Sequence, residues 1–175
     1  MTDKKTMWNE AGVAGLVLGG VSIAYMASGV LVGKMQTGVV SSLLSIVLWA
    51  AKFAGCIYLM KFFMKKFSES EPEADNSDTF RFGMMTALLS ALLYAAFSMA
   101  YMQFINPDSV TEAFESVMDM YESMLDSNSL EQIENMIPKM PAISFFTNLV
   151  YCFLFGTVLS AIFSRNIPSK NPFEN

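Results

Sequence analysis

The chain has 175 residues, of which 53% are hydrophobic and 15% charged, and its formal net charge is −5. This composition is too apolar for an ordinary soluble domain. The sequence contains no histidine, which excludes His-based acid–base catalysis and the usual zinc sites. The apolar residues gather in four stretches of about 20 residues, each long enough to cross a bilayer. We predict an all-α fold, a polytopic four-helix bundle in a single membrane domain (1–175), with spans at residues 11–33, 39–60, 82–105 and 142–164.

The first span is rich in glycine. Small residues recur in it at a spacing of four, at Ala11, Gly15 and Gly19 and again at Gly29 and Gly33. Small residues at this spacing allow the backbone of a second helix to approach closely. We predict that these five positions pack against a helix, which is either another span of the bundle or a helix from a second copy or another protein. Because the apolar run is longer than the core of a signal peptide, we interpret the span as a retained helix.

The second span carries Lys52, the only charged residue inside any of the four spans. Lys52 lies roughly 12 Å from the span end at Met60, farther than its side chain reaches. The spans contain no Asp or Glu, so we expect no protein carboxylate within bonding distance. Three roles remain open: an ammonium that snorkels or is solvated by hydroxyls, a contact with a lipid phosphate, or a part in transport. Hydroxyls at comparable depth come from Ser22, Ser90, Tyr94 and Thr157.

The basic residues predict the orientation of the spans. If the spans alternate, eight Lys and Arg residues fall on one side and only Lys34 and Lys139 fall on the other. Because basic residues concentrate in the cytoplasm, we predict that both termini are cytoplasmic and that Lys52 points toward that side. The acidic, serine-rich segment 61–81 is then a cytoplasmic loop, which we expect to be solvated and flexible. The eight residues are Lys4, Lys5, Lys61, Lys65, Lys66, Arg81, Arg165 and Lys170.

The outer loop, residues 106–141, has the pattern of one or two amphipathic helices on the periplasmic side. Asp108 and Ser109, with Glu112 following, are typical of a helix start with a capping box. A second such start, Ser129 with Gln132, precedes a shorter apolar stretch that Pro138 ends.

The apolar stripe of the first outer helix has two interpretations. It either covers the outer ends of the spans or forms a methionine-rich surface on which a protein partner docks. The candidate docking residues are Phe114, Met118, Tyr121 and Met124. The acidic residues of the opposite face lack the spacing of a calcium-binding EF-hand loop, so we predict no metal site there.

The sequence offers few candidates for catalytic or cofactor-binding residues. Cys56 and Cys152 lie inside spans, where cysteine behaves as a small apolar residue. No nucleophile–base pair and no phosphate-binding loop is recognisable. We therefore predict no catalytic residues and no cofactor, and we expect membrane lipids rather than nucleic acid as partners.

Four stretches, WNEAGVAGLVLGG, MQFINPD, SAIFSR and the terminal NPFEN, resemble a family of short four-span proteins of Bacteroidota that is catalogued as a domain of unknown function. The resemblance covers nearly the whole chain and implies a bacterial inner-membrane location. It implies no catalytic or binding residues. Genes of this family often neighbour a glycosyltransferase similar to polyprenyl-phosphate sugar synthases, which implies such an enzyme as a partner.

Three functional hypotheses follow. The favoured one is a non-catalytic accessory or scaffold subunit of an inner-membrane complex, which docks a polyprenyl-phosphate glycosyltransferase or forms a homo-oligomer. The alternative is a small oligomeric transporter or lipid flippase, although the chain lacks the in-span acid and the inverted repeats typical of such proteins. The third is an integral-membrane enzyme using Tyr, Ser, Cys152 or the acidic residues of the outer loop.

Overall fold

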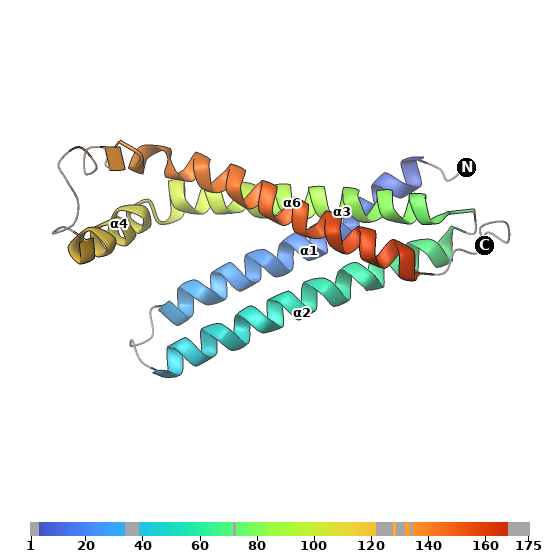
Figure 1. The fold of residues 1–175 in the computed structure, drawn as a ribbon, viewed down its shortest axis with the longest axis horizontal. Helices are drawn as coiled ribbons and strands as arrows, with labels where there is room; N and C mark the ends of the chain where they lie inside the picture. Colours follow the sequence, from blue (N-terminus) through green and yellow to red (C-terminus); the bar gives the residue numbers. More distant parts are fainter. Residues whose placement is uncertain are drawn as a thin grey trace. The chain divides into compact units, whose positions relative to one another are not determined.

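The computed structural model describes residues 4–33, 39–71, 73–121, 128, 132, 133 and 135–167. These residues are mostly helical, and no strand occurs among them. In chain order the elements are α1 (Lys4–Gly33), α2 (Val39–Ser70), α3 (Asn76–Ala100), the π-helical segment η1 (Tyr101–Ile105), α4 (Asp108–Tyr121), the 3₁₀ turn η3 (Ile137–Lys139) and α6 (Met140–Asn166) (Figure 1).

Four helical stretches are long and apolar enough to cross a membrane. They are Lys4–Val32, Val39–Ser70, Asn76–Ile105 and Ile137–Asn166, with lengths of 29, 32, 30 and 30 residues. At about 1.5 Å per residue each exceeds the roughly 30 Å of a hydrocarbon core. The prediction of an all-α membrane protein with four spanning helices is confirmed.

The helices contribute to two compact units. The first comprises residues 1–94 and 149–175, and the second comprises residues 95–148. The first unit contains α1, α2, most of α3 and the larger part of α6, and within it α1 and α2 lie side by side (Figure 1).

In the first unit, α3 contacts α1, α2 and α6 through glycines. A Cβ atom added at Gly15 of α1 would lie 2.8 Å from the Cβ of Leu89 and 3.3 Å from the backbone nitrogen of Ser90 on α3. One added at Gly83 of α3 would lie 2.6 Å from the Oγ of Ser160 on α6. Non-bonded carbons settle at about 3.5–4.0 Å, so these helices approach more closely than a larger residue would allow.

Small residues also recur at a spacing of four in α3 and α6. These positions were not among the helix-packing residues predicted from the sequence. At Gly156 of α6 an added Cβ would collide with the Cβ of Ala87 on α3, so the two series face each other. Small-residue series of this kind drive helix association in lipid, where apolar burial alone gives no gain. The members are Gly83, Ala87 and Ala91 on α3 and Gly156, Ser160 and Ser164 on α6.

A cluster of larger apolar residues closes one end of the first unit. Phe67 of α2 and Phe82 of α3 stack with ring centroids 4.3 Å apart, and both are buried. Ala11 of α1, Met64, Ala74 and Ile167 belong to the same buried cluster. The start of α1, the end of α2, the start of α3 and the end of α6 therefore meet at this end.

The connection between α2 and α3 is shorter than the loop predicted for residues 61–81. Helix α2 continues ten residues beyond Met60 to Ser70, and α3 already begins at Asn76. The reason is the buried cluster, because Met64 and Phe67 lie one turn apart on one face of the extended helix. Asp75 caps the start of α3, with its Oδ1 accepting a hydrogen bond from the backbone nitrogen of Asp78 at 2.6 Å.

The second unit contains the helix end at Asn106 and the start of α4. The backbone nitrogen of Asn106 donates to the carbonyl of Tyr101, five residues back, at 2.8 Å, and the following Pro107 disfavours further helix. The hydroxyl of Ser109 donates to the carbonyl of Asn106 at 2.6 Å, and α4 begins at Asp108, the residue before it.

Polar side chains also link α3 to α6 inside the second unit. The amide nitrogen of Asn148 donates to the hydroxyls of Ser98 and Ser144, at 3.2 and 3.1 Å. The second predicted outer helix, which begins at Ser129, lies mostly outside the described residues.

Candidate functional site

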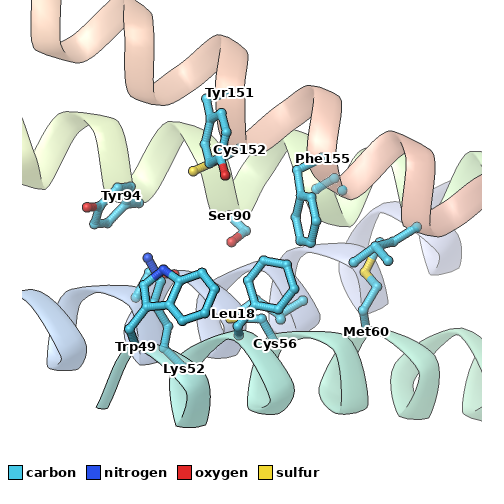
Figure 2. Close-up of a pocket in the computed structure, with 15 residues that line it drawn as sticks. Leu18, Trp49, Lys52, Cys56, Met60, Ser90, Tyr94, Tyr151, Cys152 and Phe155 are labelled. Carbon is cyan, nitrogen blue, oxygen red and sulfur yellow. The ribbon is translucent and has the colours of Figure 1, made fainter. Parts of the chain in front are cut away.

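A cavity of about 130 Å³ lies inside the first unit and is lined by residues from all four of its long helices (Figure 2). A single water needs only about 10–15 Å³ of such space, so the cavity has room for a chemical group. Its lining contains one ammonium, several hydroxyls, an indole and two thiols among apolar side chains. The lining residues are Leu18, Ser22, Trp49, Lys52, Phe53, Cys56, Met60, Ala87, Ser90, Tyr94, Tyr151, Cys152, Phe155, Gly156 and Leu159.

The ammonium of Lys52 lies against two tyrosine rings. Its Nζ is 4.8 Å from the ring centroid of Tyr25 on α1 and 5.0 Å from that of Tyr94 on α3. A cation over an aromatic face gains up to about 2 kcal/mol when desolvated. Two such contacts are comparable with the roughly 2.5–3.5 kcal/mol that a charge costs at the centre of a spanning helix on insertion scales. The two rings thus help to explain why a lysine is tolerated at this depth.

No carboxylate accompanies Lys52 among the described residues. Two ion pairs there, Lys65 with Glu69 and Arg81 with Asp78, join residues that do not line the cavity. The cavity lining contains no Asp, Glu or His. Among the described residues, Lys52 therefore has no anionic partner.

Three of the four hydroxyl residues that the sequence placed at the depth of Lys52 line the cavity, namely Ser22, Ser90 and Tyr94. The fourth, Thr157, instead donates to the carbonyl of Phe153 at 2.8 Å. Tyr25 was not among the predicted residues, although it lies about one turn from Ser22 on the same helix face. A search for aromatic residues near in-span hydroxyls would have found it.

An aromatic row joins α2 to α6 beside the cavity. Trp49 stacks on Phe53 with centroids 5.4 Å apart, and Phe53 meets Phe155 of α6 at 5.0 Å. Trp49 and Tyr151 line the cavity, yet they are 55% and 66% exposed. The cavity therefore opens between these two side chains, which come from α2 and α6.

Both cysteines also line the cavity. Cys56 of α2 and Cys152 of α6 are half-buried, and neither forms a disulfide. No imidazole or carboxylate lines the cavity to take a proton from either thiol, so the lining lacks the base that activates a nucleophilic cysteine.

The structure places the small residues of α1 in different surroundings. Ala11, Gly15 and Gly19 are buried, and an added Cβ at Gly19 would lie 2.7 Å from Cδ2 of Leu93 on α3. Gly29 is exposed with open space around it, and Gly33 is the last residue of α1. Gly15 and Gly19 thus face α3 and Ala11 is buried, whereas Gly29 faces no helix of the described chain.

The candidate docking residues lie on and beyond α4. Phe114 and Met118 are half-buried, and Glu115 is exposed. Tyr121 ends α4, while its side chain and the whole of Met124 lie outside what the structure describes. Within the described residues no group of three or more His, Cys, Asp or Glu side chains is placed to hold a metal ion.

The chain matches a family model over most of its length. A family model described as "Protein of unknown function (DUF4199)" matches residues 14–165. No curated protein and no solved structure matches the chain. The match confirms the predicted resemblance to a family catalogued as a domain of unknown function.

Proposed function

The chain belongs to the family DUF4199, proteins of unknown function, and we propose that it is a non-catalytic accessory subunit of a membrane complex. It is a small multi-pass membrane protein, as its four long apolar helices indicate. Its proposed task is to hold a membrane-associated enzyme at the bilayer, with a polyprenyl-phosphate glycosyltransferase as the first candidate.

The lining of the Lys52 cavity carries this proposal. It offers a cation, hydroxyls and an indole, all of which bind and orient a polar group. It contains no carboxylate or imidazole, although general acid–base catalysis most often uses one of these. The site is therefore equipped for binding rather than for bond making or breaking.

We also propose a bacterial cytoplasmic-membrane location with both termini inside. The end of the first unit that carries the Phe67–Phe82 cluster is also its basic end, which supports this orientation because basic residues concentrate on the cytoplasmic side. The exposed basic residues there are Lys4, Lys5, Lys61, Lys65, Lys66, Arg81 and Arg165. In this orientation, helix α4 and its candidate docking residues lie on the periplasmic side.

Co-purification tests the accessory role. We expect the tagged full-length chain, co-expressed with a polyprenyl-phosphate glycosyltransferase, to retain that enzyme in mild detergent. Replacing Phe114 and Met118 by Glu should weaken retention about tenfold or more, because loss of central apolar anchors costs about 2 kcal/mol or more. Glu115→Gln, on the exposed face of the same helix, is the matched control. Recovery of the free chain alone in several mild detergents would count against the proposal.

A lipid flippase or small transporter is the second candidate, favoured by the position of the cavity among all four long helices. Reconstitution in liposomes separates the two functions. Under the accessory proposal, fluorescent phospholipid should cross these membranes no faster than in protein-free liposomes. A faster rate that disappears in Lys52→Met would instead identify a flippase.

A further inference from the structure

We propose that the Lys52 cavity is a binding site for a phosphate group, supplied either by the headgroup of an anionic lipid or as a free anion. The proposal names a ligand for the cavity that supports the accessory role, and this binding does not depend on any protein partner. Three features of the cavity support this site: its charge, the donors around it and the place where it opens.

The charge of the cavity is positive and unbalanced within the described chain. Tyr25 and Tyr94 stabilise the ammonium of Lys52 through their ring faces, but a neutral ring leaves the net charge in place. No acidic residue lines the cavity. In a medium of low dielectric constant an uncompensated cation attracts an anion far more strongly than it does in water.

Hydrogen-bond donors suited to phosphate oxygens surround the same space. The lining includes the indole of Trp49 and the hydroxyls of Ser22, Ser90 and Tyr94. Figure 2 shows Trp49 and Lys52 rising from α2 toward the space that Ser90 and Tyr94 of α3 border on the other side. Phosphate oxygens accept several such bonds at once, whereas a neutral polar group would leave the charge of Lys52 unmatched.

The opening lies at a level where the helices face the hydrocarbon region of the bilayer. Trp49 and Tyr151, the exposed residues of the lining, lie within the apolar parts of α2 and α6 rather than at the helix ends. Trp49 is ten residues from Val39, roughly 15 Å along the helix. An opening at this level faces lipid, so a headgroup can reach Lys52 sideways while its chains stay outside.

Trp49 provides the readout for a direct test. The chain has two tryptophans, and the other, Trp8, does not line the cavity. In a Trp8→Phe background, the emission of Trp49 is followed while the purified full chain in neutral detergent is titrated with short-chain phosphatidic acid. We expect a saturable change, with a dissociation constant at least about tenfold higher for Lys52→Met, since that variant loses a charge-assisted hydrogen bond.

Two controls decide between a specific site and a general effect of charge. Lys61→Met removes an exposed lysine from the same helix and should leave the dissociation constant unchanged. Diacylglycerol with the same chains should not bind with comparable affinity. Competition by inorganic phosphate would identify a free anion as the ligand, and its failure to compete would identify the lipid headgroup.

The proposal is overturned if diacylglycerol binds as tightly as phosphatidic acid, or if Lys52→Met binds as tightly as the parent chain. Helix content by circular dichroism and a single elution peak establish that the variant is folded. Should the variant not fold, the comparison of the two lipids on the parent chain decides the question.

Discussion

Gly15→Leu is expected to lower the free energy of unfolding by about 1–3 kcal/mol, the usual cost of overpacking. The substituent has no room, since its Cβ alone would lie 2.8 Å from Cβ of Leu89 and 3.3 Å from backbone atoms of Thr86 and Ser90 on α3. Backbone atoms cannot rotate away, so α1 and α3 must separate. Unfolding in detergent, followed by circular dichroism during titration with sodium dodecyl sulfate, measures the change.

Gly20→Leu is the matched control for this substitution. Gly20 lies on the same helix, is exposed and has no atom within 4 Å of an added Cβ. Because leucine has a higher helix propensity than glycine, this variant should unfold at the same or a slightly higher detergent fraction. Equal destabilisation by both variants would show that the close approach of α1 and α3 does not hold the bundle together.

Phe67→Ala is expected to be still more destabilising, by about 3–5 kcal/mol. The Phe67 ring is 0% exposed and stacks on Phe82 with an angle of 4° between the ring planes. Its removal leaves a cavity where α2, α3 and the end of α6 meet, since Ile167 belongs to the same cluster. The same detergent titration measures the loss, and proteolysis at the 71–75 connection should become faster.

Phe62→Ala provides the comparison for Phe67→Ala. Phe62 is on the same helix but is 49% exposed, and its ring contacts are with Tyr58 and Phe63 of α2 itself. We expect a much smaller loss than for Phe67→Ala, because no cavity forms between helices. If the two variants lost equal stability, the buried cluster would not be the feature that extends α2 beyond Met60.

The sequence by itself determined the fold class. Runs of about 20 apolar residues have few alternatives to spanning helices, because lipid offers no partner for an unpaired backbone group. The length of the connection between α2 and α3 was predicted less well. The acidic residues of segment 61–81 suggested a loop, but Met64 and Phe67 lie at helical spacing and pack on Phe82, which keeps the chain helical to Ser70.

The sequence also singled out Lys52 and three of the hydroxyls near it, because both the charge of a side chain and its depth along a spanning helix can be read from residue order. It did not reveal Tyr25, the contact of the ammonium with the ring faces of Tyr25 and Tyr94, or the thiols that share the cavity. Those depend on how each helix is rotated and how closely it approaches its neighbours. The facing small residues of α1, α3 and α6 set that approach, so only the tertiary structure decided which side chains surround Lys52.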